Sequence, residues 1–388
     1  MEYTYPTFFY DFECEASDCS DTCCKGWGIA IDPVSLKKYR KYPGFFGNRL
    51  KNSIDWEHGY FEQYNGRCAF LNEENLCDIY AEAGKEMLCK TCTRYPRHYE
   101  EYENLREISL SLSCPAAARL ILGSDKKMEF LNECRKTPEE EYEQFDFFLF
   151  TKLGEIRDYF YEVVQDREQP IEDRMALILA VSHDLQKRIQ REQLYAIDDL
   201  LKRYRTPAFS KTANKKFEKY RNQKTRHREQ IKHMFRTLYR LEVLRPSWHQ
   251  SLKRREKRLY QELSKEEYHK ISQEFAVYYQ EKQYEYEQLF MYFLFNHVCT
   301  AVYDQDLFSK VKLSVFHTLM IQKLNLAVWL EQGKSFTFED QIKIAHSYAR
   351  EIEHSDPNLE AIDHMMAEDE LFTLDKLLIA VLGETQPA

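Results

Sequence analysis

Glycine and long apolar runs are both scarce in this 388-residue chain, and each absence excludes a class of site. The chain has only 11 glycines, and no G-x-G-x-x-G follows an expected strand, so the usual dinucleotide-binding loop is not expected. The longest purely apolar run in the C-terminal half, Leu289 to Phe295, is far shorter than the roughly 20 residues that a membrane helix needs. We therefore expect no transmembrane segment and no membrane partner.

A secretion signal is also missing from the start of the chain. Met1 is followed by Glu-Tyr-Thr-Tyr, without a basic segment, an apolar segment or a small-residue cleavage site. We therefore expect a cytoplasmic protein whose thiols stay reduced. An odd total of 11 cysteines, with Cys23 and Cys24 adjacent, fits disulfide pairing poorly.

Cysteines are concentrated near the N-terminus. Nine of the 11 lie in the first 114 residues, in groups: Cys14, Cys19, Cys23, Cys24, Cys68, Cys77, Cys89, Cys92 and Cys114. Cysteines that only fill a core scatter along a chain, whereas thiolates that share a metal come from a few short loops. Clustering favours these nine as metal ligands over structural disulfides or unligated core residues.

Ligand spacing limits the kind of centre. Cys89-Lys-Thr-Cys92 is a Cys-x2-Cys knuckle, which places two thiolates on one tight turn. The Cys-x3-Cys-x2-Cys loop of the radical S-adenosylmethionine enzymes is absent, because Cys23 is followed directly by Cys24. Zinc and a [4Fe-4S] cluster both accept four thiolates, so both remain open.

Composition divides the chain into two regions. Residues 1–125 hold eight of the 11 glycines and nine cysteines, which predicts a loop-rich, metal-binding module with short strands. Residues 126–388 predict an α-helical domain, so the fold class is mainly α. In the first region we expect a strand at Trp27–Ile31, a helix capped by Asp32 with Pro33 in its first turn, and an alternating strand at Ile108–Leu112. Cys114 would begin the next helix, where backbone N–H groups favour a thiolate.

Helical stripes dominate the second region. We expect a helix opened by Thr137-Pro138, and a capping box at Thr337 and Asp340 before the helix at 338–352. Further helices are expected at 289–302 and 310–330. Two apolar stripes are Phe145, Leu149, Leu153, Ile156, Phe160 and Val163, and then Met175, Ile178, Val181, Leu185 and Ile189.

Charge is uneven along the chain. Leu201 to Tyr260 contains 20 Lys or Arg against 4 Glu, a net +16, which leaves about −25 for the rest of the chain. This segment is either a solvated helical face or a docking surface for an acidic partner. No base-reading motif accompanies it, so nucleic acid is not an expected partner.

Four cysteine motifs carry a resemblance to a known module. They are the pair Cys23-Cys24, Cys68-Ala-Phe-Leu71, Cys77-Asp-Ile-Tyr80 and Cys92-Thr-Arg-Tyr-Pro96. They resemble a zinc- or iron-chelating cysteine-rich module with the pattern CC, C-x-F-L, C-x-I-Y and C-x-x-Y-P. This chain has Cys89 where that module usually has a proline.

Longer stretches are similar to the flagellin lysine-N-methylase family. They are 21–27, 110–119, 301–307 and 350–358. The resemblance implies transfer of methyl groups from S-adenosylmethionine to lysines of flagellin, with the cysteine module holding a metal centre. Methylation of lysine needs walls that tolerate cations, and aromatic faces provide them; the chain has 27 Tyr and 25 Phe.

Other polar residues have two interpretations. Three of them lie beside the knuckle, namely Tyr95, Arg97 and His98. They either act near the metal or are ordinary surface residues. A second set either caps helices or meets substrate: Asp304, Asp306, Glu353, His354 and Asp356. Cys134 and Cys299 are expected to be inert packing residues on helices.

Two functions follow from these patterns. The first is a metal-containing lysine methyltransferase acting on flagellin. The alternative is a zinc- or iron-binding module with a helical partner-docking domain and no catalysis. The enzyme is favoured because the resemblance to the methylase family continues to Asn358, far beyond the cysteine module.

Overall fold

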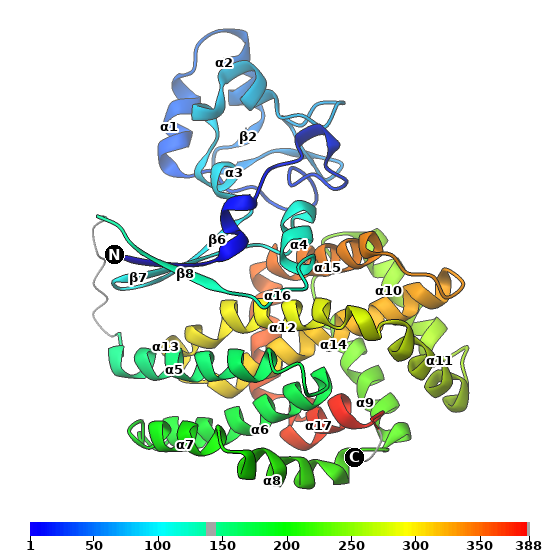
Figure 1. The fold of residues 1–388 in the computed structure, drawn as a ribbon. Helices are drawn as coiled ribbons and strands as arrows, with labels where there is room; N and C mark the ends of the chain where they lie inside the picture. Colours follow the sequence, from blue (N-terminus) through cyan, green and yellow to red (C-terminus); the bar gives the residue numbers. More distant parts are fainter. Residues whose placement is uncertain (137–144, 386–388) are drawn as a thin grey trace.

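A body of helices carries a four-stranded sheet and, beyond it, a small lobe rich in cysteine, as the computed structural model of residues 1–136 and 145–385 shows (Figure 1). The lobe is drawn in blue and cyan and the helices in green to red. The expectation of a mainly α fold with short strands near the N-terminus is confirmed.

The lobe has its own small core, formed by residues between Ile29 and Cys92. Its helices are α1 (Pro33–Lys41), α2 (Gly44–Asn52) and α3 (Lys90–Arg94), and its two short hairpins pair β2 (Ile54–Asp55) with β3 (Tyr60–Phe61) and β4 (Gln63–Tyr64) with β5 (Arg67–Cys68). Tyr39 is completely buried in this core and donates a hydrogen bond to the carbonyl oxygen of Met87 at 2.6 Å. With so little apolar area, the lobe depends on such contacts and on any ligand that its cysteines bind.

The main sheet has the strand order β6-β7-β1-β8. Its strands are β1 (Glu2–Pro6), β6 (Arg97–Tyr102), β7 (Leu105–Leu110) and β8 (Phe130–Cys134). β1 runs parallel to β7 and antiparallel to β8, with Glu2 opposite Leu105 and Cys134. Tyr3, Tyr5 and Leu110 belong to the same large core as the helices, so this sheet, including a strand from beyond residue 125, is part of the helical body.

Helices surround a long central helix, α14 (Leu307–Glu331). The others in the body are α4 (Pro115–Leu122), α5 (Phe147–Val164), α6 (Ile171–Ile189), α7 (Ala196–Tyr204), α8 (Pro207–Phe217), α9 (Lys224–Thr237), α10 (Pro246–Tyr260), α11 (Lys265–Tyr278), α12 (Tyr284–His297), α13 (Ala301–Asp304), α15 (Phe338–Glu353), α16 (Asp356–Glu368) and α17 (Leu374–Leu382). Contrary to the expectation from apolar runs, α14 is long and apolar enough to cross a membrane, but 83% of its apolar window is buried inside the protein. That burial is typical of a core helix.

Most local predictions are confirmed. Asp32 caps α1 by accepting hydrogen bonds from the amides of Val34 and Ser35, and Thr337 and Asp340 form the expected capping box of α15. Both apolar stripes are buried on α5 and α6, except for Phe145, which precedes α5 and is partly buried.

Two predictions need comment. Trp27–Ile31 is not a strand: the segment makes only an isolated bridge between Ala30 and Tyr60, because its neighbour β3 is two residues long. The expected helix start at Thr137-Pro138 lies outside the described residues, and α5 itself begins at Phe147 with Asp146 as its cap.

Candidate functional site

Five thiols of the lobe form one group: Cys24, Cys68, Cys77, Cys89 and Cys92. The amide of Cys68 donates a hydrogen bond to the carbonyl of Cys24 at 2.8 Å, which places these two loops side by side. Burial raises the pKa of the Cys68 thiol to about 12, and the negative charges of Cys24, Cys77 and Cys89 raise it further. We call this set the five-thiol group.

Hydrogen bonds between paired cysteines set which thiol ionises first. A hydrogen bond from Cys23 lowers the pKa of Cys24 to about 7, and one from Cys92 lowers the pKa of Cys89. Their partners shift the opposite way, since each pair shares one proton. Thiolates are the metal-binding form of cysteine, so each of these two pairs can supply a thiolate to a metal.

The remaining four cysteines of the N-terminal set, Cys14, Cys19, Cys23 and Cys114, lie where the lobe meets α4. Burial raises the pKa of Cys19 and Cys114, and the hydrogen bond with Cys24 raises that of Cys23. Cys14 makes a smaller electrostatic contribution to all three, so the four thiols are neighbours. We call them the four-thiol group. Cys114 does sit at the N-cap of α4, but burial outweighs the amides of Ala116 and Ala117 and raises its pKa to about 11. The expected contribution of the backbone N–H groups is therefore present, but burial of the thiol is the larger effect.

Thiol groups of this kind match the donor chemistry of zinc and of iron–sulfur clusters. Within residues 1–136 and 145–385, however, no three His, Cys, Asp or Glu side chains are already arranged to hold a metal ion. Binding of a metal is coupled to the folding of the segments that hold it. The two groups supply donors of the right type, and an ion would have to draw the loops together.

The two cysteines outside the N-terminal set differ from expectation in one respect. Cys134 lies on β8 and is exposed, so it is neither helical nor a packing residue. Cys299 is buried in the short turn Val298–Thr300 between α12 and α13, as a packing residue would be.

A charged clamp joins the cysteine loop to the helical body. The guanidinium of Arg350, on α15, lies 2.6 Å from the carboxylate of Asp21 and donates a second hydrogen bond to the carbonyl of Thr22 at 2.7 Å. Arg245 reaches the same Asp21 carboxylate at 3.2 Å and also pairs with buried Glu351. The loop that carries Cys23 and Cys24 is thus tied to α15 by buried charge pairs.

Beside the clamp lies a polar cluster at the end of α15. The imidazole Nε2 of His354 is 2.9 Å from the hydroxyl of Ser113, which in turn is 3.1 Å from the hydroxyl of Tyr95. Ser111 donates a hydrogen bond to one carboxylate oxygen of Glu353, and Tyr292 donates one to the other at 3.1 Å. Burial lowers the pKa of the His354 imidazole to about 3 and raises the pKa of the Glu353 carboxyl.

Aromatic rings cover this cluster. The ring of Trp27 lies 4.5 Å from the imidazole of His354 and 6.0 Å from the ring of Tyr95, measured between centroids. The indole N–H of Trp27 donates to the carbonyl of Cys23 at 2.6 Å, which fixes the ring against the cysteine loop. A neutral imidazole, a carboxyl and aromatic faces therefore lie together beside the thiol groups.

Three of the four stretches that resemble the methylase family meet at this place. Asp21 and Trp27 come from the first stretch, Ser111 and Ser113 from the second, and the 350–358 stretch supplies the last side chains of α15. The fourth stretch, 301–307, lies elsewhere, where Tyr303 donates a hydrogen bond to the carbonyl of Glu101. No local pattern singled out Ser111, Ser113 or Tyr292, and only the resemblance of the stretches themselves pointed here.

The other polar candidates have structural roles. Asp306 caps α14 through the amide of Ser309, Asp304 pairs with Lys310 at 2.7 Å, and Asp356 is exposed in the first turn of α16. His98 is hydrogen-bonded to Glu100 at 2.8 Å, and Arg97 lies over the rings of Phe9 and Phe12. Of the residues named from the sequence, Tyr95, Glu353 and His354 are the ones that the fold brings together.

Many arginines of the basic segment 201–260 are neutralised by acidic partners. Four of the exposed pairs are Arg205–Glu162, Arg240–Asp369, Arg254–Glu331 and Arg258–Glu262. The segment therefore presents less free charge than its sequence suggests, which favours the solvated-face interpretation.

Comparison with known proteins agrees with the resemblance. A stretch of the chain is 34% identical over 134 residues to the flagellar biosynthetic protein FliU of Salmonella muenchen, covering 32% of this chain and 79% of that protein. It is 33% identical over 134 residues to lysine-N-methylases of Salmonella choleraesuis and Salmonella typhimurium, and spans only 33% of their length. No solved structure matches the chain significantly. Residues 157–380, more than half of the chain, match the FliB lysine N-methylase C-terminal domain, and the chain therefore belongs to the FliB lysine N-methylase family.

Proposed function

We propose that this protein transfers methyl groups from S-adenosylmethionine to lysine side chains of flagellin. The observation that carries the proposal is the junction of the lobe with α15, where Trp27, Glu353 and His354 meet beside the thiol groups. Membership of the FliB family supports lysine as the acceptor, and the flagellar name of one relative supports a flagellar substrate.

The proposed reaction is a direct displacement at the methyl carbon. The lone pair of a neutral lysine amine forms the new N–C bond while the S–C bond breaks, so the sulfonium leaves as the thioether S-adenosylhomocysteine. The amine must first lose a proton, because the ordinary pKa of lysine is about 10.4. Glu353 suits this task better than His354, since burial raises the pKa of its carboxyl, whereas it lowers the pKa of the His354 imidazole to about 3. The neutral His354 can accept a hydrogen bond from the amine and hold it in position.

The aromatic rings suit a cationic reaction. Both the sulfonium donor and the methylated ammonium carry a positive charge, and the faces of Trp27 and Tyr95 attract such cations without pairing with them. The half-buried carboxyl of Glu353 adds an acceptor on the same side of the junction. This combination tolerates positive charge before and after transfer.

In this proposal the thiol groups hold zinc or a [4Fe-4S] cluster. The five-thiol group is the larger donor set, and the four-thiol group lies next to Trp27 and Tyr95. A bound centre would order the cysteine loops. No radical is needed, because a neutral amine is already a nucleophile. The proposed location is the cytoplasm, where such thiols stay reduced.

Incubation of the metal-replete protein with flagellin and S-adenosylmethionine tests the proposal. Methylation should increase the mass of lysine-containing peptides in steps of about 14 Da. Unmodified flagellin in the presence of donor and metal would favour the alternative, a metal-binding module that docks a partner.

A further inference from the structure

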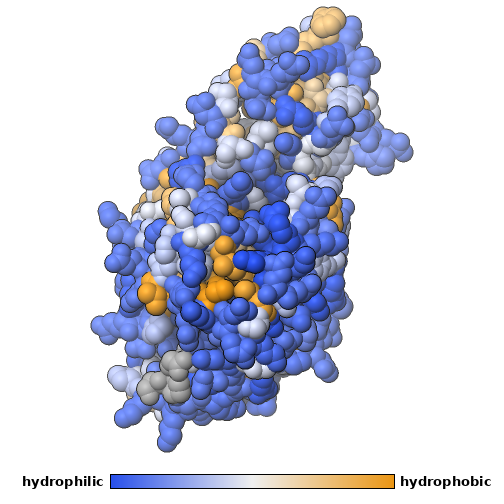
Figure 2. Space-filling view, turned by 90° about the vertical axis from the view of Figure 1, so that its right-hand side faces the viewer, coloured by the Kyte–Doolittle hydropathy of each residue, from blue (hydrophilic) through white to orange (hydrophobic). Residues whose placement is uncertain are grey.

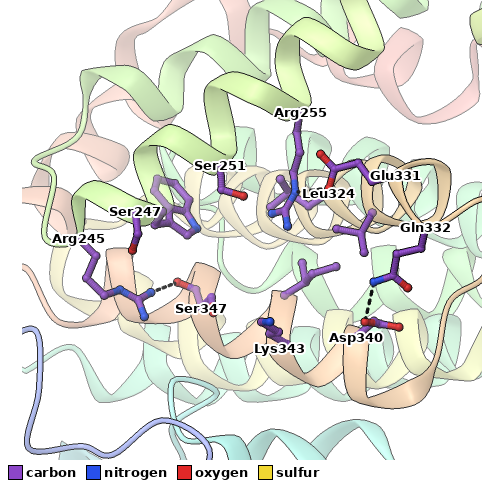
Figure 3. A pocket seen from close by; sticks show the side chains of 13 residues that line it. Arg245, Ser247, Ser251, Arg255, Leu324, Glu331, Gln332, Asp340, Lys343 and Ser347 are labelled. Atoms are coloured by element: carbon purple, nitrogen blue, oxygen red, sulfur yellow. Dashed lines mark hydrogen bonds and ion pairs between the residues drawn. The ribbon is translucent and has the colours of Figure 1, made fainter.

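A groove with a cavity volume of about 270 Å³ lies between α10, α14 and α15 (Figure 3). Each helix contributes residues from one face. The polar residues of the groove include Arg245, Arg255, Glu331, Gln332, Asp340 and Lys343. Sequence reasoning missed this groove, because its residues are spread over three helices at ordinary helical spacing.

The groove has an apolar floor and a polar rim. Leu324, Val328 and Ile344 line it and are nearly fully buried within the protein. Figure 2 views the molecule from the right-hand side of Figure 1 and shows an apolar area in the helical body, surrounded by hydrophilic side chains. Half-buried Trp248 adds a flat aromatic face to the wall. A floor and wall of this kind suit a planar ring.

The rim of the groove carries more positive side chains than its own carboxylates neutralise. Glu331 pairs with Arg254, which lies outside the groove, at 3.0 Å, so Arg255 keeps only a distant contact of 3.7 Å with the same carboxylate. The Nε of Arg255 is buried without a hydrogen-bond partner, and Figure 3 shows its side chain pointing into the groove. Lys343 forms no ion pair within 4 Å in the part of the chain that the structure describes.

The negative side chains of the groove are already engaged. Asp340 accepts hydrogen bonds from the Thr337 amide, within the capping box of α15, and from the Gln332 side chain. Arg255 and Lys343 therefore remain to bind an anionic group. A ligand with a carboxylate and an aromatic ring would be complementary to these groups.

One end of the groove reaches the cysteine loop. Arg245 lines the groove and donates a hydrogen bond to the Ser347 carbonyl at 2.7 Å, while its guanidinium also contacts Asp21. Its side chain packs so closely on Gly26 that a Cβ added there would lie 3.4 Å from Cδ of Arg245. A ligand in the groove would thus lie against the residue that ties α15 to the loop of Cys23 and Cys24.

We propose that this groove is the binding site of the methyl donor, S-adenosylmethionine. The proposal rests on the proposed function for the identity of the ligand. Arg255 and Lys343 bind the carboxylate of the donor, and Trp248 stacks on its adenine ring. The methionyl end of the donor thereby pairs with the two cations, while the adenosyl end of the same molecule stacks on the aromatic wall.

Calorimetric binding of S-adenosylhomocysteine, the unreactive product, to the metal-replete full-length protein tests this site. Arg255→Ala, Trp248→Ala and the exposed charge reversal Lys343→Glu should each weaken binding by about tenfold or more. Trp248→Phe should retain most of the affinity, because it keeps a ring face. Lys253→Ala is the matched control: Lys253 is exposed on the same helix, outside the groove, and its substitution should change nothing. Thermal unfolding of each variant checks its folding, and Lys343→Glu carries the test where a buried substitution impairs it.

Methylation of flagellin, measured on the same proteins, separates the two proposals. Wild-type affinity in Arg255→Ala, Trp248→Ala and Lys343→Glu, together with active wild-type enzyme, would overturn the groove and leave the function standing. Weakened binding in those variants with no methylation of flagellin by any protein would support the groove and overturn the substrate. A wild-type protein that binds no S-adenosylhomocysteine would overturn the groove directly.

Discussion

The Arg350 guanidinium lies 2.6 Å from the Asp21 carboxylate, and this pair joins the cysteine loop to the last turns of α15. Arg350 is only 2% exposed, and it also holds the backbone of Thr22. The position of Trp27 over His354 therefore depends on a buried charge pair between residues from opposite ends of the chain.

Removal of this charge should loosen the junction. Arg350→Met leaves the Asp21 carboxylate with less compensation, and breaking such a buried pair costs about 3 kcal/mol of folding free energy. Arg254→Met is the control, because Arg254 is 64% exposed in its pair with Glu331 and should cost less than about 1 kcal/mol. Denaturant unfolding followed by tryptophan fluorescence measures both. Equal losses in the two variants would contradict the account of the clamp.

Metal content should depend on the five-thiol group. We expect Cys68→Ser and Cys77→Ser to release most of the bound zinc or iron, since serine is a poor ligand for soft metals. Cys134→Ser, at an exposed position on β8, should retain it. Metal analysis and the absorption spectrum of anaerobically purified protein provide the measurement, and full occupancy in both substituted proteins would remove this group from the metal site.

Methyl transfer should depend on His354 without affecting the metal. If its neutral imidazole holds the lysine amine in position for transfer, His354→Ala should lower the rate of flagellin methylation by about 100-fold, since a small misplacement of the reacting groups has an effect of that size. Metal content should stay unchanged. A substitution that merely disrupted the structure of the junction would lower the metal content as well. Asp356→Asn, two residues further along and exposed, serves as the control. An unaltered rate in His354→Ala would exclude the proposed role.

Stability should fall as the pH rises from about 4.5 to about 7 because of Glu285. Burial raises the pKa of this carboxyl to about 7 in the folded protein, against an ordinary value of 4.5, although Tyr279 donates a hydrogen bond to it. Over this interval the unfolded chain loses a proton that the folded chain keeps, so rising pH favours unfolding.

Glu285→Gln removes that titration and keeps an acceptor for Tyr279. As the pH rises from 4.5 to 8, the unfolding free energy of the variant should increase by about 1–3 kcal/mol relative to that of the wild type. Glu281→Gln, at an exposed position nearby, should show no such gain. The unfolding free energies of the wild type and Glu285→Gln should be measured across this range. A constant difference between the two would refute the raised pKa of Glu285.

Local elements of the fold were predictable because their signals are local. Asp32 before Pro33, and Thr337 three residues before Asp340, determine helix starts through side-chain contacts within one turn. The strand expected at Trp27–Ile31 failed for the opposite reason: a strand also needs a partner, and β3 offers only two residues.

The candidate site was predictable only in part. The cysteine spacing identified the thiols but not their division into two groups, because that division depends on which loops pack against α4. His354 and Glu353 were recognised as polar residues at a helix end. Their contacts with Ser113 and Ser111 depend on the tertiary packing of α15 against the sheet, which no periodicity in the sequence records.

The central claim is a direct transfer of an intact methyl group to lysine, and a donor with a fully deuterated methyl group tests it most directly. Metal-replete protein, flagellin and this S-adenosylmethionine should give lysine peptides heavier by about 17 Da for each transfer, with all three deuterium atoms retained, since displacement breaks no C–H bond. Peptides without added mass, or with methyl groups that have exchanged deuterium for hydrogen, would contradict the account.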